Sequence, residues 1–318
     1  MRRPFVWIGA AGAAVLAAVA IWRALSAPST LDEAAFAARY SEPLPPPGRA
    51  MQVYHLGHSL VGRDMPAMVA QLAAAAGYTE HGYHSQLGWG ASLDQHWRGE
   101  VPGFAEENAH DRHRPVRAAL TSGGYDAVVL TEMVELRDAI RWHDSARALA
   151  DWARAARGGR RDVRVYLYET WHRLDDPAGW LARIDTDRGA LWEGVLLRQA
   201  MARKGVGTVH VIPAGQVMAA LVRAIEAGEV PGLSRRQDLF AVTPEGVPDP
   251  IHLNDIGAYA VALTHVAVLY GQSPEGLPHA LLRADGTPAT APGPEAAAAM
   301  QRLVWRVVTG YRLAGVTR

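Results

Sequence analysis

The fold is decided by the stretch QVYHLGHSL, which runs from Gln52 to Leu60. Its first part, Gln52 to Leu56, is a short apolar run that ends at Gly57. The residues from Pro66 to Ala76 then follow a helical pattern that is closed by a glycine. This order predicts a strand, a turn and a helix, and it places Ser59 in the turn.

The same alternation of strand and helix recurs along the chain. Compact β-prone runs occur at Asp126 to Leu130, Val163 to Tyr168 and Thr208 to Ile212, and the stretches Ser145 to Ala156 and Leu191 to Lys204 have amphipathic helical patterns. Strands that alternate with helices predict an α/β fold with a mostly parallel sheet covered on both faces, a three-layer α/β/α sandwich. In such sheets ligands bind beyond the carboxyl ends of the strands.

Composition excludes several classes of function. The 318 residues carry 32 basic and 32 acidic side chains, for a formal net charge of zero. The basic residues are interspersed with acids, so nucleic acid is not an expected partner. The chain has no cysteine, which excludes disulfides, thiolate nucleophiles and cysteine-ligated zinc.

The N-terminus predicts export. Met1 to Arg3 is a short cationic start, Phe5 to Ile21 is an uninterrupted apolar run, and Ala24 to Ala27 offers small residues for cleavage. Residues 1–27 are therefore interpreted as a signal peptide or as an uncleaved membrane anchor, because the apolar run is close to the roughly 20 residues that span a bilayer. Either way the protein is expected in the periplasm, free or attached to the membrane through this segment.

A linker is expected between this segment and the folded domain. Residues 28–50 include the run Pro43 to Gly48, whose fixed backbone angles suit an extended chain. The catalytic domain is expected to cover residues 51–318.

Ser59, His252 and Asp249 are the candidate catalytic residues. A serine at the turn after a strand presents its hydroxyl at the edge of the sheet, but it is inert without a positioned base. A carboxylate three residues before a histidine can hold its Nδ1–H and leave Nε2 to take the serine proton. Taken singly, Ser59 could equally be a helix cap and His252 a structural histidine.

These residues also carry a family resemblance. Gly57 to Leu60 resembles the first block of the SGNH hydrolases, also called GDSL esterases and lipases, with His58 in place of the usual aspartate. Asp249 to His252 resembles their last block, and Tyr168 to Trp171 is similar to a strand-end stretch in some of them. The resemblance covers about residues 52–274. It implies a flavodoxin-like sheet, the triad Ser59, Asp249 and His252, and an oxyanion hole.

The expected oxyanion hole is incomplete. In the family it is built from the amide of the serine, the amide of a second-block glycine and a third-block asparagine. The resemblance implies the amides of Ser59 and Gly90, with Gly90 favoured over Gly88. After the strand the chain continues from Thr131 to Glu135 without an asparagine, and an ionised carboxylate cannot donate a hydrogen bond. Three alternatives stay open: Thr131 donates, Glu132 is protonated, or the chemistry is slow or altered.

Substrate contacts are expected from Glu132, Trp89 and Trp171. For Glu132 two alternatives stay open: it could be a catalytic acid, or it could accept hydrogen bonds from loop amides. The tryptophans could stack on sugar rings, although tryptophans also commonly pack in cores and at rims. Two groups of side chains have spacings that a metal could use: His81 with His84, and His110 with Asp111 and His113. Neither group forms a full ligand set on a helix face, so no metal and no cofactor is expected.

The sequence thus predicts a serine esterase that cleaves an ester, with an O-acetyl group on a glycan as the first expectation for the substrate. An O-acetyltransferase would use the same site with a sugar hydroxyl as the acceptor. The missing asparagine motivates a third alternative, an envelope glycan-binding module that has lost turnover.

Overall fold

The computed structural model describes residues 29–317. The predicted export segment, residues 1–27, lies outside this range. Among the described residues no helix is both long and apolar enough to cross a membrane.

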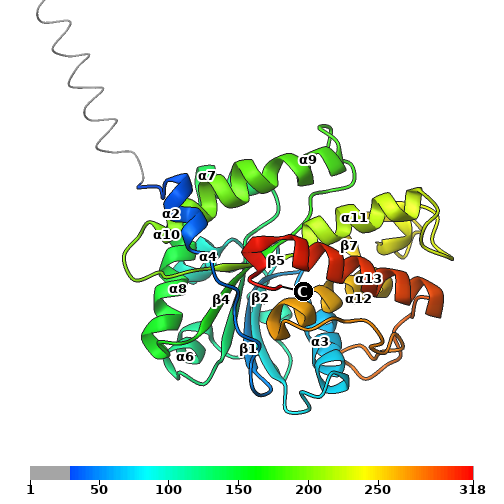
Figure 1. The fold of residues 1–318 in the computed structure, drawn as a ribbon, viewed down its shortest axis with the longest axis horizontal. Helices are drawn as coiled ribbons and strands as arrows, with labels where there is room; N and C mark the ends of the chain where they lie inside the picture. The colour runs from blue at the N-terminus through cyan, green and yellow to red at the C-terminus, as the bar shows by residue number, and fades with distance from the viewer. Residues whose placement is uncertain (1–28, 318) are drawn as a thin grey trace, which may run out of the picture.

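The centre of the molecule is a parallel sheet of five strands (Figure 1). In chain order the strands are β1 (Gln52–His58), β2 (Gly82–Gly88), β3 (Ala127–Thr131), β4 (Arg164–Glu169) and β5 (His210–Pro213). Their spatial order is β2-β1-β3-β4-β5, which is the flavodoxin-like order. The predicted α/β fold with a mostly parallel sheet is confirmed.

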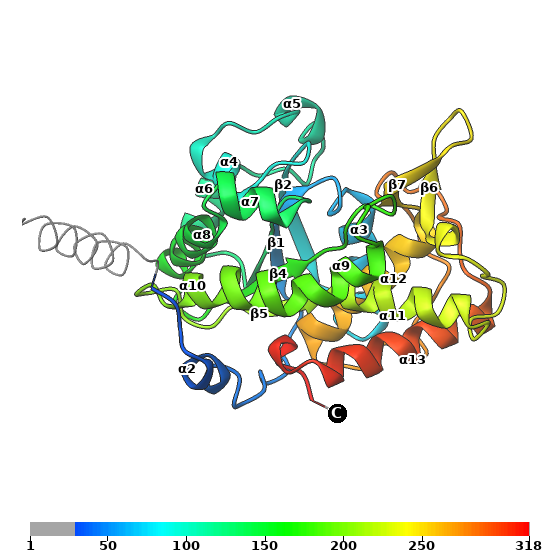
Figure 2. The same cartoon turned by 90° about the horizontal axis from the view of Figure 1, so that it is seen from above.

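Helices cover both faces of the sheet (Figure 2). One face packs against α3 (Asp64–Ala75), α9 (Trp180–Asp187), α11 (Ala214–Glu226), α12 (Asp255–Tyr270) and α13 (Pro294–Gly310). The other packs against α4 (Leu93–Arg98), α6 (Val116–Thr121), α7 (Leu136–Trp142), α8 (Ser145–Gly159), the π-helix η1 (Arg188–Leu197) and α10 (Arg198–Met201).

Alternation along the strands separates the two cores. In β4, Val165 and Leu167 belong to the α8 core, whereas Tyr166 and Tyr168 belong to the α12 core. Successive side chains of a strand point to opposite faces, so a strand that is apolar throughout must be covered on both sides.

The strand order places a crevice beside Ser59. β1 pairs with β2 on one side and with β3 on the other. The connection from β1 to β2 and the connection from β2 to β3 therefore cross the sheet in opposite directions. A Cβ at Gly57 would lie 2.7 Å from the Cβ of Thr131, which shows how closely the ends of β1 and β3 approach. Ser59 and Glu132 therefore leave neighbouring strands at the same edge of the sheet.

Two irregular regions rise at this edge (Figure 2). One contains the short helix α5 (Phe104–Glu107). The other is the hairpin of β6 (Phe240–Val242) and β7 (Pro248–Leu253), which follows the 3-10 helix η2 (Arg236–Leu239) and forms a small antiparallel sheet of its own. The candidate residues Asp249 and His252 therefore lie on a strand, β7.

The segment interpreted as a linker contributes to the packed body. Helix α2 (Glu33–Ala38) begins at the cap residue Asp32 and buries Phe36 in the α8 core. The hydroxyl of Tyr40 donates to the carbonyl of Val209 at 2.7 Å, close to the C-terminal 3-10 helix η3 (Arg312–Ala314) that packs on β5. Packing thus starts before Met51, because this alanine-rich segment carries two buried aromatic side chains that an extended linker would expose.

Candidate active site

Ser59 follows β1 directly and precedes α3 by a short turn. The turn is held from both sides of the sheet. The hydroxyl of Tyr168 donates to the carbonyl of Leu60 at 3.2 Å, and Nε2 of His96, on α4, lies 2.8 Å from the carbonyl oxygen of Gly57. These contacts fix the backbone on either side of the serine.

His58, which stands where the SGNH block has an aspartate, is a buried anchor. Its Nε2 lies 2.9 Å from the carbonyl oxygen of Glu132, and its Nδ1 lies 3.4 Å from the amide of Leu60. Burial lowers the pKa of His58 to about 4, although the hydrogen bond to Glu132 opposes this shift. The neutral ring therefore donates through Nε2 and ties the turn after β1 to the turn after β3.

The structure brings Ser59, His252 and Asp249 together. Nε2 of His252 lies 2.9 Å from Oγ of Ser59, and Nδ1 lies 2.9 Å from Oδ2 of Asp249. Because the aspartate accepts at Nδ1, Nε2 is left with a lone pair directed at the serine hydroxyl. This arrangement can draw the proton from Ser59.

Asp249 is held in its charged form. Partial burial raises the pKa of Asp249, but hydrogen bonds from the amides of His252 and Ile251 and from the His252 ring outweigh it and leave the pKa lowered. Both amides donate to Oδ1 at 2.8 Å, so that Oδ2 is left for the imidazole.

The strand that carries this pair is clamped by its neighbours. Nε1 of Trp171 donates to the carbonyl of Ile251 at 2.8 Å, and the amide of Leu174 donates to the carbonyl of Pro250 at 2.7 Å. Asn254 caps α12 immediately afterwards and also donates to the carbonyl of Asp238 at 2.8 Å. Trp171 was expected to contact substrate, but it is 1% exposed and instead fixes the backbone next to His252.

A cavity of about 540 Å³ opens beside Ser59 and His252. Trp89 and Gly90 also line it. Trp89 is 55% exposed, as a side chain that meets a ligand at the rim would be. Gly88 is packed away from the cavity, since a Cβ there would lie 2.3 Å from Val101, and this favours Gly90 as the glycine beside the serine.

Thr131 and Glu132 lie outside the cavity lining. Both are fully buried. The Glu132 carboxylate accepts from the amide of Met133 at 2.8 Å and from the amide of Leu93 at 3.1 Å, so it joins two loops rather than facing a substrate. Burial raises its pKa to about 7, although the hydrogen bonds from Met133, Ser145 and Leu93 oppose the shift.

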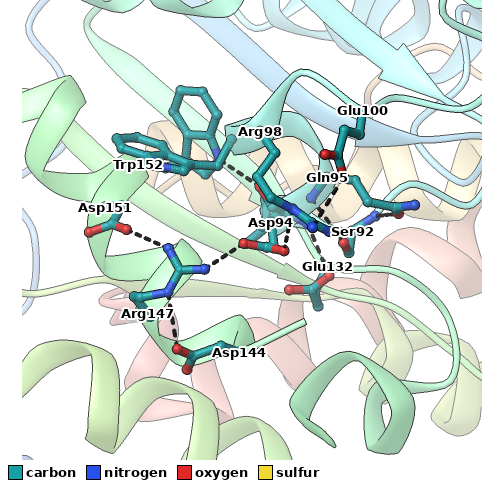
Figure 3. Close-up of polar contacts among 12 residues, drawn as sticks. Ser92, Asp94, Gln95, Arg98, Glu100, Glu132, Asp144, Arg147, Asp151 and Trp152 are labelled. Carbon is teal, nitrogen blue, oxygen red and sulfur yellow. Dashed lines mark hydrogen bonds and ion pairs between the residues drawn. The ribbon is translucent and has the colours of Figure 1, made fainter. Parts of the chain in front are cut away.

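Helix α4, which begins shortly after Gly90, packs against α8 and is joined to it by polar contacts (Figure 3). Asp94 pairs with Arg147 and with Arg98, and Nε1 of Trp152 donates to the carbonyl of Leu93 at 2.9 Å. Ser92 starts α4 with a capping box. Sequence reasoning did not identify these contacts, because their members come from separate helices.

Sequence reasoning also missed much of the cavity wall. Beyond the predicted residues it is lined by charged and ionisable side chains, namely Glu107, Glu135, His172, Arg173 and Asp176. One hint was present in the sequence: Glu135 falls within the stretch from Thr131 to Glu135 that follows a predicted strand.

Of the histidines with metal-like spacing, His81 and His84 each contact a tyrosine hydroxyl. Nδ1 of His81 lies 2.6 Å from the hydroxyl of Tyr270, and Nδ1 of His84 lies 3.0 Å from the hydroxyl of Tyr125. Within residues 29–317 no three or more histidine, aspartate or glutamate side chains gather in a way that could hold a metal ion.

Comparisons with known proteins give a distant structural likeness. No protein-family model matches the sequence, and no curated protein matches it. Among solved structures, a crystal structure from Parabacteroides merdae ATCC 43184 described as a "putative GDSL-like lipase" is 12% identical, with a TM-score of 0.43. The match covers 70% of this chain and 96% of that chain. The chemistry of the site therefore rests on its own geometry.

Proposed function

We propose that this protein is a serine esterase. One observation carries the proposal: a serine hydroxyl at the carboxyl edge of the sheet lies 2.9 Å from the Nε2 atom of a histidine whose Nδ1 atom is held by a carboxylate. These are the groups, in the order of contact, that activate a serine for attack on an acyl carbon.

The reaction follows from the contacts. Oγ of Ser59 attacks the ester carbonyl as Nε2 of His252 takes its proton, and Asp249 stabilises the imidazolium that forms. The imidazolium returns the proton to the departing alkoxide, which leaves an acyl group on Ser59. Water, activated by the same histidine, then releases the acid and restores the serine.

The oxyanion would be met by backbone amides of Ser59 and Gly90. Thr131 does not line the cavity, so it is not part of this proposal. Losing one donor of an oxyanion hole typically costs about 2.7 to 4 kcal/mol of transition-state stabilisation. A site with two donors is accordingly expected to be slower than one with three.

The proposed substrate is an O-acetyl group on a glycan, and the proposed location is the periplasm. Support for the substrate comes from the exposed Trp89, which could stack on a sugar ring, and from the charged side chains in the cavity wall, which can bond to hydroxyl groups. Location rests on the sequence of residues 1–27 alone.

Hydrolysis of p-nitrophenyl acetate tests the proposal. The wild-type domain should turn over this ester and should be labelled by a fluorophosphonate, whereas Ser59→Ala should lose both properties. Ser41→Ala, which alters an exposed serine, is the matched control and should behave as wild type. Equal background rates for wild type and Ser59→Ala, without labelling of either, would reject the esterase in favour of a module that only binds.

A further inference from the structure

The cavity wall beside Ser59 combines apolar side chains, among them Leu60, Val134 and Ile251, with several charged ones. Glu107, Glu135 and Asp176 line it, together with one guanidinium group, that of Arg173. Arg173 is itself paired with Asp175 at 2.8 Å, so its charge is largely balanced outside the cavity. The wall therefore presents an excess of negative charge to whatever occupies the space next to the serine.

Two of these carboxylates are fixed by a buried arginine. The Arg183 side chain is 3% exposed and contacts Glu135 at 3.0 Å and Asp176 at 2.5 Å. It also contacts Asp187 at 2.8 Å, and Asp187 in turn lies 3.2 Å from Nε2 of His172. The guanidinium of Arg183 thus contacts three carboxylates. One positive charge does not neutralise three negative ones, so these four side chains together carry a net negative charge.

The remaining bases do not reverse this balance. Burial and the neighbouring Arg183 lower the pKa of His172, against the pull of Asp187, Glu135 and Asp176, so the ring is neutral near pH 7. Arg137, whose side chain is 56% exposed, reaches Asp187 only at 3.8 Å. Near Glu107, the guanidinium of Arg63 donates to the carbonyls of Glu106 and Glu107.

An aromatic platform faces the same cavity. Trp89 is held by Gly103, which has a positive φ of 62°, and a Cβ at Gly103 would lie 2.2 Å from the indole ring. Only a glycine can pack so closely beneath the ring, so the backbone supports it from one side while the side chain stays largely exposed. A flat, fixed ring beside carboxylates suits the apolar face and the hydroxyl edge of a sugar.

We propose that this cavity selects esters whose alcohol portion is a neutral or amino-bearing sugar and rejects those whose sugar carries a carboxylate. The inference rests on the proposed esterase function and names the class of its substrate. Carboxylates accept hydrogen bonds from hydroxyl and ammonium groups, and they repel a carboxylate of the ligand across a partly desolvated cavity.

Three methyl glycosides acetylated at the same ring position provide the test: a glucoside, a glucosaminide with a free amine, and a glucuronide. The wild-type kcat/KM should be similar or higher for the glucosaminide than for the glucoside, and about tenfold or more lower for the glucuronide at low ionic strength. Raising NaCl to about 0.5 M should narrow the gap, because salt screens charges at this separation.

Glu107→Gln should narrow the same gap without abolishing turnover. Its matched control is Glu106→Gln, which removes the same charge from the neighbouring exposed residue outside the cavity lining and should keep the wild-type preference. An equal loss of preference in both variants would show that general surface charge, not the cavity, is responsible.

The outcomes separate this inference from the function beneath it. Equal kcat/KM for all three glycosides, or the highest value for the glucuronide, overturns the inference while Ser59-dependent turnover keeps the esterase. Turnover of p-nitrophenyl acetate without turnover of any glycoside also overturns it. If fluorophosphonate fails to label wild type, the esterase itself is rejected and the inference falls with it.

Discussion

At the scale of single residues, Asp249 sets the direction of the proton relay. It receives two backbone amides on Oδ1 and the imidazole on Oδ2. An asparagine at this position could still accept the amides, but its NH₂ group would donate to Nδ1 of His252 and force the proton onto Nε2. The ring could then no longer accept the proton of Ser59.

Asp249→Asn is therefore expected to lower kcat by roughly 10³- to 10⁴-fold with little change in KM. Steady-state kinetics on p-nitrophenyl acetate measure this, and circular dichroism checks that the fold is kept. A loss of less than about tenfold would contradict the role assigned to the carboxylate.

Glu132 is the second residue with a measurable signature. Its folded pKa is about 7 against an ordinary value of 4.5, so the folded state holds a proton that the unfolded state releases over this range. Stability contributed by this group is full below about pH 4.5 and is lost as the pH rises through about 7.

Glu132→Gln should therefore be more stable than wild type at pH 8, by as much as ~3 kcal/mol, and nearly equal to it at pH 5. Glu132→Ala should be less stable at both, because the buried amides of Leu93 and Met133 lose their acceptor. Guanidinium unfolding at the two pH values measures the differences. If the free energy of unfolding differed between Glu132→Gln and wild type by the same amount at pH 5 and at pH 8, Glu132 would not titrate in this range.

At the scale of elements, the hairpin of β6 and β7 holds the base and the carboxylate, while the turn after β1 holds the nucleophile. His252 reaches Ser59 because hydrogen bonds hold β7 against the segment that follows β4. The hydrogen bond from Trp171 to the carbonyl of Ile251 is one such tie, and it lies one residue from His252.

Trp171→Phe removes this bond and keeps most of the packing. We expect a loss of about 1 kcal/mol in stability and a several-fold slower rate of fluorophosphonate labelling. Trp180→Phe is the matched control, since Trp180 is also buried and also donates to a carbonyl, that of His172 at 2.8 Å. If fluorophosphonate labelling slowed equally in both variants, the hydrogen bond from Trp171 to β7 would have no special role in placing His252.

The elements also show what sequence could and could not predict. β1, β3, β4 and β5 are short apolar runs, and their positions were predicted to within a few residues. β2 was missed because its residues, GYHSQLG, lack the β-branched side chains that mark a buried strand. β7 was not predicted as a strand. It contains Pro248 and Pro250, which a strand tolerates only where the ladder leaves their nitrogens unpaired.

The residues of the candidate site also differ in whether the sequence could predict them. Ser59, Asp249 and His252 could be found because their chemistry is local: a serine after a strand, and a carboxylate three residues before a histidine. The acidic wall could not, because Glu135, Asp176 and Arg183 meet only through the packing of α7 against the long helical stretch that begins at α9. No periodicity records such a contact.

At the scale of the whole molecule, buried histidines dominate the response to acid. Burial lowers the pKa of His58, His81, His96, His210 and His265 to about 4 each, and it also holds the pKa of His55 well below its ordinary value. The folded state keeps these rings neutral, whereas the unfolded chain protonates them near 6.5. Their contribution to stability is full above about pH 6.5 and is lost as the pH falls toward 4.

The two buried glutamates act in the opposite direction but are fewer. Glu132 and Glu169 both have a pKa of about 7, so they favour folding as the pH falls. Six histidines against two glutamates leave a net loss of stability of several kcal/mol between pH 6.5 and pH 4.5, comparable with the total stability of a domain.

We therefore expect the protein to unfold cooperatively in acid, with a midpoint near pH 5. Tryptophan fluorescence recorded as a function of pH measures this midpoint. His81→Gln should shift the midpoint lower, because a glutamine keeps a partner for the hydroxyl of Tyr270 without taking up a proton. A wild-type protein that stays folded at pH 4 would show that these rings accept protons in the native state.

The tip of the hairpin offers a place to attach a reporter. Pro244, Glu245 and Gly246 are exposed and lie outside the lining of the cavity, yet they belong to the hairpin that carries Asp249 and His252. Because the native sequence has no cysteine, Glu245→Cys would create a unique thiol for a fluorophore or a spin label. Such a probe would follow any displacement of the relay from its nucleophile in real time, without occupying the chamber where the ester is cleaved.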